Sequence, residues 1–161
     1  MDGPTPEDVR ILFRWLKEGP PGAIRVEDQG QQLGSLQAVT WEDAGDRLAL
    51  ERLARWQKSS WSRAPESFPI RSGTIRQWLT EEILSREDRL LFWVRDVHED
   101  SAGYLGIQWL KEEKNRAILT DRLSDGRLGE RLMERAAHTL GNWLRESLGL
   151  ELEGRARARA A

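Results

Sequence analysis

Hydrophobic residues recur at helical spacing near the start of the chain. Four of them share one face of a helix: Val9, Leu12, Phe13 and Leu16. Thr5 supplies a capping oxygen before that face and Pro6 suits the first helical position, so we expect the helix to begin there. It should end at about Glu18, because the Gly-Pro-Pro-Gly run at 19–22 cannot continue it.

Two further helices are expected before the middle of the chain. Thr40, followed by acidic residues, predicts a capped helix over about 42–57. Its buried side should hold Leu48, Leu53 and Trp56, with Leu50 and Ala54 at the margin. Residues 58–73 contain prolines and serines typical of a loop. A helix over 74–84 follows, with Ile75, Trp78, Leu79 and Ile83 on one face.

Short apolar runs separated by turn residues predict strands. Two lie at 23–28 and 33–39, joined by a hairpin turn at 29–31, and three more lie at 89–95, 103–110 and 116–120. Within 89–95, alternate residues face opposite sides: Leu90, Phe92 and Val94 on one, Leu91 and Trp93 on the other. Both faces are apolar, so this strand should be central. Short polar connections favour an antiparallel meander for the last three strands.

The longest helix is expected over about 127–148, followed by a strand at 150–153. Its buried stripe consists of Leu128, Leu132, Ala136, Leu140, Trp143, Leu144 and Leu148. Gly149 ends it, and the Arg-Ala tail at 154–161 has no pattern of a folded element, so we expect that tail to be disordered. The predicted class is α+β (mixed α/β): helices flanking a central, mainly antiparallel sheet.

Composition narrows the functions that such a domain can have. The 161 residues suit one domain, and 25 basic against 27 acidic residues argue against a nucleic-acid or membrane partner for the surface as a whole. The sequence has no cysteine, which excludes disulfides and thiolate chemistry, and its two histidines lack metal-ligand spacing. With no signal-peptide pattern and no run of about 20 apolar residues, we expect a cytoplasmic protein. Most of the eight tryptophans should be core residues.

Several short segments follow one another in a characteristic order. They are 36–44, Trp78-Leu79 ahead of 88–94, the Gly-Tyr-Leu-Gly-Ile run at 103–107, and 126–136 leading to Trp143 and 148–150. Together they span about three-quarters of the chain, and in this order they resemble the GCN5-related N-acetyltransferase (GNAT) family. The similarity is nearest to the branch containing ribosomal-protein N-terminal and amino-sugar acetyltransferases. It implies a GNAT-like domain over 36–153, with a helix-and-hairpin extension over 1–35 and the tail at 154–161.

The resemblance also implies that acetyl-CoA binds where a strand turns into the long helix. Gly126 and Gly129 at the helix start would leave backbone N–H groups free to hold a diphosphate. The implied cofactor-binding residues are Leu119, Arg122, Leu123, Asp125, Gly126, Arg127, Leu128, Gly129, Glu130 and Arg131. The same residues are explained without a ligand by glycines that reverse the chain and arginines that keep it soluble. Glu130 departs from the family pattern, because it places an acid beside the expected phosphate.

Acetyl transfer needs a base to take a proton from the amine. Asp121 is the nearest candidate for this catalytic role, with Glu42 and His98 as more distant ones, and each is also explained as a turn, cap or hairpin residue. The family's fold continues with a helix that often carries a tyrosine acid and with two strands that close the acceptor site. This sequence ends at Ala161 and its only tyrosine is Tyr104, so we expect the C-terminal part of that fold to be missing.

Functions of different classes fit these observations. One is an acetyl-CoA-dependent N-acetyltransferase acting on a small-molecule or peptide primary amine, such as an amino sugar or an N-terminal amine. Another is a non-catalytic GNAT-like binding module, or a fragment of a larger protein. A third is a protein-binding domain that uses exposed aromatic residues around Trp56 and Trp61. An unclosed sheet would leave an edge strand to cover, which favours a homodimer.

Overall fold

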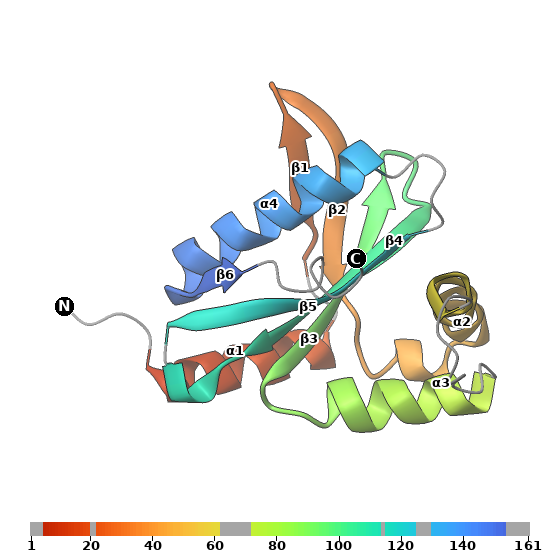
Figure 1. Ribbon diagram of the computed structural model, residues 1–161, viewed down its shortest axis with the longest axis horizontal. Helices are drawn as coiled ribbons and strands as arrows, with labels where there is room; N and C mark the ends of the chain where they lie inside the picture. The colour runs from red at the N-terminus through yellow and green to blue at the C-terminus, as the bar shows by residue number, and fades with distance from the viewer. Residues whose placement is uncertain (1–4, 20–21, 62–71, 114, 125–129, 154–161) are drawn as a thin grey trace.

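The computed structural model describes residues 5–19, 22–61, 72–113, 115–124 and 130–153 (Figure 1). In these residues the strands form one six-stranded sheet in the order β1-β2-β3-β4-β5-β6. They are β1 (Ile24–Asp28), β2 (Gln31–Ala38), β3 (Arg89–Asp96), β4 (Ser101–Trp109), β5 (Arg116–Ser124) and β6 (Glu151–Glu153). Neighbouring strands are antiparallel except β5 and β6, which are parallel. The predicted α+β class and mainly antiparallel sheet are confirmed.

Helices cover both faces of this sheet (Figure 1). One face carries α1 (Pro6–Glu18) and α4 (Glu130–Leu148), and the other carries α2 (Arg47–Trp61), α3 (Ser72–Trp78) and the π-helix η2 (Leu79–Leu84). Short 3-10 turns, η1 (Asp43–Gly45) and η3 (Lys111–Glu113), lie in the connections. The alternation predicted for β3 is confirmed: Leu90, Phe92 and Val94 pack with α1 and α4, while Leu91 and Trp93 pack with α2 and α3.

The N-terminal helix and hairpin form for the reasons visible in the sequence. Thr5 and Asp8 make a capping box, in which Thr5 Oγ1 accepts the Asp8 N–H at 3.2 Å and the Asp8 carboxylate accepts the Thr5 N–H at 2.8 Å. The hairpin turn is made by Gln29 and Gly30, with φ of 54° and 80°, a conformation that glycine adopts without a steric penalty. Val26 of β1 joins the core under α1 and α4, so this segment is part of the main sheet.

The helix predicted over 42–57 differs from expectation in its start and its end. It begins at Arg47 and continues to Trp61. Its cap is Asp46, whose carboxylate accepts the Leu48 N–H at 3.0 Å. The later start corrects the predicted burial: Leu48 lies in the first turn and is 66% exposed, while Leu50, assigned to the margin, is 1% exposed.

The expected cap at Thr40 serves a different purpose. The Asp43 carboxylate does accept the Thr40 N–H at 2.9 Å, but it also accepts the Trp93 Nε1–H at 3.1 Å. Because this second bond ties the turn to β3, the chain closes here as the 3-10 turn η1 rather than entering the helix directly. A contact between residues far apart in the chain therefore overrides the helix start predicted from neighbouring residues.

Other boundaries shift by a few residues. The helix predicted over 74–84 begins at Ser72 and its second half is the π-helix η2. The strand predicted over 116–120 extends to Ser124, and the long helix is described from Glu130. Predictions for 62–71, 125–129 and 154–161 lie outside the described residues. No helix in the described part of the chain is long and apolar enough to cross a membrane.

Candidate functional site

The candidate site lies along β5, whose two edges are paired differently. On one side β5 pairs with β4 from Ala117 to Ser124. On the other side it pairs with the parallel strand β6 only from Arg116 to Ile118. Beyond Ile118 this edge has no strand partner among the described residues.

A cavity of about 260 Å³ lies between β5, β6 and α4. Leu119 and Arg122 of β5 form one wall and Leu152 of β6 another. The remaining lining residues come from the middle of α4: Ala137, His138, Gly141, Asn142 and Arg145. We call this cavity, together with the adjoining part of β5 beyond Ile118, the β5 groove. Polar side chains of α4 and residues of β5 thus border the same space.

The two charged residues at the start of α4 have different partners, one on β5 and one on β1. Arg122 NH2 lies 3.7 Å from Glu130 Oε2, and the Glu130 side chain is 94% exposed. Arg131 turns to β1 instead, where its Nε and NH2 donate to Asp28 Oδ2 at 3.1 and 2.7 Å. The hydrogen bond from Arg131 lowers the pKa of Asp28, which keeps that carboxylate ionised. Of these arginines, Arg122 is the one that lines the groove.

Asp121 lies on the opposite face of the sheet from Leu119. The reason is a bulge in β5: Gly106 pairs with Asp121 and the next residue of β4, Ile107, pairs with Leu119, which leaves Thr120 as the extra residue. Leu119 therefore joins the core on the α4 face. The Asp121 carboxylate lies over Gly106, where an added Cβ would stand 2.7 Å from Oδ2, so this glycine makes room for it.

The Asp121 carboxylate is held by two polar side chains. Thr120 Oγ1 donates to its Oδ2 at 3.0 Å, and Arg89 NH2 lies 3.5 Å from the same oxygen. The Asp121 side chain is 26% exposed and that of Arg89 16% exposed, so the pair is reachable from solvent yet mostly enclosed. Arg89 was missed in the sequence, where it stands as an ordinary charged residue at the start of an apolar strand.

Tyr104 is placed where it cannot exchange protons readily. It is fully buried, Gln57 Nε2 donates to its hydroxyl at 2.9 Å, and the Trp56 ring lies at a centroid distance of 6.0 Å. Burial, and after it the charge of Asp121, raise the pKa of Tyr104 well above its usual range. The tyrosine therefore stays protonated and anchors the core under α2.

The other sequence candidates lie apart from β5. Glu42 is exposed before η1, and His98 is exposed in the turn between β3 and β4. Leu123 packs against the α2 and α3 core. Residues 125–129, which include both predicted turn glycines, lie outside the described residues. Among the described residues, no group of histidine and acidic side chains is arranged to hold a metal ion.

One of the two tryptophans on which the protein-binding interpretation depends is buried. Trp56 is 3% exposed and packs edge-on against Trp93, so it belongs to the core and is not available on the surface. The lining residues of α4 were missed in the sequence, although Gly141 in a helix interior was a signal, because an interior glycine lowers helix stability unless its lack of a side chain is used.

The sequence matches no family model and no curated protein. Comparison of the fold with solved structures gives a different result. The ribosomal alpha-N-protein acetyltransferase RimL aligns with a TM-score of 0.58 at 18% identity, covering 80% of this chain and 68% of that one. The chain has the GNAT fold. A GNAT-family acetyltransferase from Chromobacterium violaceum also aligns with a TM-score of 0.58, at 23% identity, and covers 80% of this chain and 64% of that one.

A GCN5-related N-acetyltransferase from Brucella melitensis aligns with a TM-score of 0.56 at 16% identity and covers 83% of this chain. The aligned part spans 58% of that protein's length, so the match covers the body of the GNAT fold rather than the whole of these enzymes. The resemblance stated from the element order is confirmed at the level of the GNAT fold.

Proposed function

We propose that this chain is an N-acetyltransferase that binds acetyl-CoA in the β5 groove and transfers the acetyl group to a primary amine. The observation that carries the proposal is a cavity between β5, β6 and α4 that Leu119 and Arg122 line, at the point where strand pairing with β6 stops at Ile118. An extended chain with amide groups can pair with a strand edge in place of another strand. The GNAT fold makes acetyl-CoA the cosubstrate to test first.

The described residues suit that ligand in shape and charge. The backbone of residues 119–123 would receive the pantetheine arm, and Arg122 would face the diphosphate. Asp125, Gly126, Arg127, Leu128 and Gly129 stay in the proposal as the phosphate turn on the strength of the sequence alone. Acetyl-CoA supplies an activated thioester. The chain must therefore hold the acyl carbon near the bulge and remove a proton from the incoming amine.

Asp121 is the proposed base. The amine nitrogen forms a bond to the acyl carbon, the carbon–sulfur bond breaks so that CoA leaves as its thiolate, and the amine proton passes to the Asp121 carboxylate. Thr120 and Arg89 hold that carboxylate in place, and its position across the sheet from Leu119 lets the amine approach from the face opposite the cosubstrate. The acceptor class proposed is an N-terminal amine or an amino sugar.

Binding is tested first, by thermal unfolding of the full chain with acetyl-CoA. A ligand that binds only the folded state at about 100 times its Kd should raise the Tm by about 5–10 °C. Gly141→Leu, which fills the groove, should abolish the shift. Glu134→Leu is the matched control, because Glu134 lies on an exposed part of the same helix outside the cavity lining. No shift with the unmodified chain would reject the proposal.

Turnover is tested next, by following release of the CoA thiol with peptides that have free N-termini and with amino sugars. Release that depends on the amine supports the transferase. A Tm shift without release for any amine would favour the alternative, a non-catalytic acetyl-CoA-binding module.

A further inference from the structure

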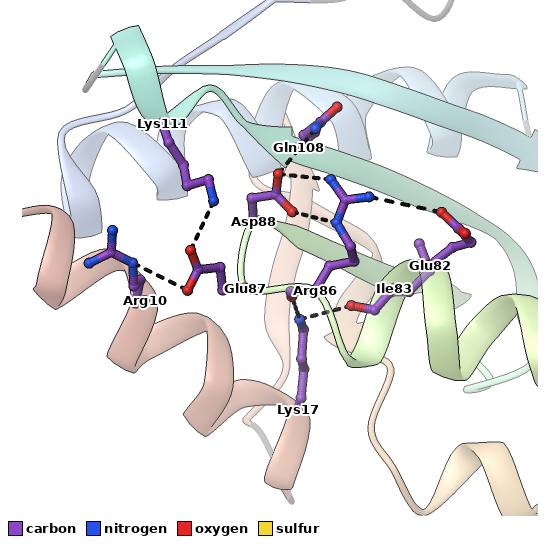
Figure 2. A network of polar contacts seen from close by, with 9 residues as sticks. All are labelled: Arg10, Lys17, Glu82, Ile83, Arg86, Glu87, Asp88, Gln108 and Lys111. Carbon is purple, nitrogen blue, oxygen red and sulfur yellow. Dashed lines mark hydrogen bonds and ion pairs between the residues drawn. The ribbon is translucent and has the colours of Figure 1, made fainter.

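A second polar site lies at the C-terminal end of α1 and is separate from the β5 groove. Lys17, near the end of α1, is only 3% exposed. Its Nζ donates to the backbone oxygen of Ile83 at 2.9 Å and to that of Arg86, at the end of η2 (Figure 2). The ammonium group therefore closes the end of a helix that comes from the opposite face of the sheet.

No carboxylate among the described residues forms an ion pair with Lys17, and the two carbonyls use two of its three N–H groups. Burial lowers the pKa of Lys17 to about 8, so the ammonium form still predominates at neutral pH. The charge of Asp88 raises the pKa of Lys17 and so favours the ammonium form, but the Asp88 carboxylate itself accepts two hydrogen bonds from Arg86. One N–H donor and a buried positive charge thus remain for an anion.

A cavity of about 180 Å³ lies where Lys17 reaches this turn. Its acidic lining residues are already neutralised. Arg10 contacts Glu7 at 3.2 Å. Arg10 also contacts Glu87 at 3.3 Å, and Lys111 Nζ contacts Glu87 at 2.9 Å (Figure 2). These pairs leave little negative charge to repel an anion.

Two other features of the cavity favour a particular kind of ligand. Arg14 lines it, is exposed and forms no ion pair within the described part of the chain. Ile11 and Trp41, which also line it, are 47% and 45% exposed, although tryptophan was expected in the core. Cationic donors beside exposed apolar side chains suit a ligand with one anionic end and one apolar end.

We propose that this cavity, defined by Ile11, Arg14, Lys17 and Trp41 and here called the α1 pocket, binds a small organic carboxylate. The carboxylate would face Lys17 and Arg14, and the apolar part would rest on Trp41 and Ile11. The volume corresponds to about six water molecules at about 30 Å³ each and is below the about 300 Å³ of sites for larger ligands, which sets the size of the acid. The α1 pocket shares no lining residue with the β5 groove.

The test uses phenylacetate, its neutral amide phenylacetamide, and acetate, each titrated into the full chain and followed by backbone amide NMR. Phenylacetate should bind at least about tenfold more tightly than phenylacetamide, because the amide lacks the charge, and should shift amides at 10–17 and 84–88. Equal affinity for acid and amide, or shifts outside these segments, would overturn the proposal. Acetate binding as tightly as phenylacetate would mean an adventitious ion only and would overturn it too.

Variants assign the binding to the pocket without relying on the buried lysine, whose removal would also release the η2 end. Arg14→Gln should weaken phenylacetate binding about tenfold. Arg47→Gln is the control, because Arg47 is also an exposed helical arginine but lies on the other face of the sheet. The proposal fails if Arg14→Gln binds as the unmodified chain does, or if both variants weaken binding equally. Acetyl-CoA binding should be unchanged in Arg14→Gln, which keeps this result separate from the proposed transferase.

Discussion

The two edges of β5 are made of the same backbone but end in different surroundings. The β4 edge pairs from Ala117 to Ser124, whereas the described part of the β6 edge pairs only at 116–118. A backbone that the protein pairs internally is closed to ligands, while an unpaired strand is a template for another extended chain. The β4 edge therefore supplies stability, and the β6 edge is where the proposed ligand would gain its contacts.

The bulge at Thr120 connects these two roles. Without it, alternation would place residues 119, 121 and 123 on one face of the sheet. With it, Leu119 faces α4 while Asp121 and Leu123 face the α2 and α3 side. The proposed cosubstrate and acceptor can then reach β5 from opposite faces.

The largest expected effect tests the chemical half of this arrangement. Asp121→Asn keeps the size of the side chain but removes the proton acceptor, so turnover should fall by about 10²–10⁴. Acetyl-CoA affinity, measured by calorimetry, should stay within about twofold, because Asp121 lies on the face away from the groove. An active Asp121→Asn variant would exclude Asp121 as the base, even if acetyl-CoA still bound in the groove.

The next prediction compares two glycines, Gly103 on β4 and Gly141 beside the β5 groove. An added Cβ at Gly103, on the β4 edge, would lie 2.3 Å from the Leu123 carbonyl oxygen, whereas at Gly141, beside the groove, its nearest contact is Leu152 Cβ at 3.8 Å. Gly103→Ala should lower the free energy of unfolding by about 1–3 kcal/mol. Gly141→Ala should raise it by up to about 1 kcal/mol, since the position is within a helix.

Urea unfolding of both variants checks this contrast. If Gly141→Ala lowered the free energy of unfolding as much as Gly103→Ala, the cavity beside α4 would be filled in solution. The β5 groove would then have to be abandoned as a binding site.

A smaller effect is expected at the charged wall of the groove. Arg122→Gln should weaken acetyl-CoA binding about tenfold, because a hydrogen bond between two charged groups is lost, and Arg122→Lys should restore part of the affinity. Arg55→Gln, an exposed arginine of α2, serves as the control. Equal affinity of the Arg122→Gln variant and the unmodified chain in calorimetry would remove the phosphate role from Arg122.

Local signals in the sequence were sufficient for elements that are stabilised locally. The capping box of Thr5 and Asp8, the hairpin turn at Gly30 and the alternation along β3 depend on residues a few positions apart, and all three form. The start of α2 was not predictable in this way. It depends on the bond from Trp93 Nε1 to Asp43, between residues 50 positions apart in the chain.

The candidate site shows the same division. Asp121 and Arg122 were predicted from the family resemblance, but no sequence pattern indicated that Thr120 is an extra residue that places Leu119 and Asp121 on opposite faces. The groove was also hidden, because its residues come from β5, the middle of α4 and β6, which meet only after folding. Lys17 was also missed, because a lysine at a helix end is normally solvated. Its burial follows from contacts with the Ile83 and Arg86 carbonyls, which are distant in the chain.

The smallest expected effect concerns the residue that departs from the family pattern. The Glu130 carboxylate lies 3.7 Å from Arg122 and competes with any phosphate for that guanidinium, but it is 94% exposed, so water and salt screen its charge. Glu130→Gln should therefore tighten acetyl-CoA binding only about two- to threefold in low salt, and the gain should disappear near 0.5 M salt, where the screening length is roughly 4 Å. Glu134→Gln, one turn further along α4, should change nothing. Weaker binding in Glu130→Gln would show that the Glu130 carboxylate orients Arg122 toward the groove. Glu130 would then assist acetyl-CoA binding instead of opposing it.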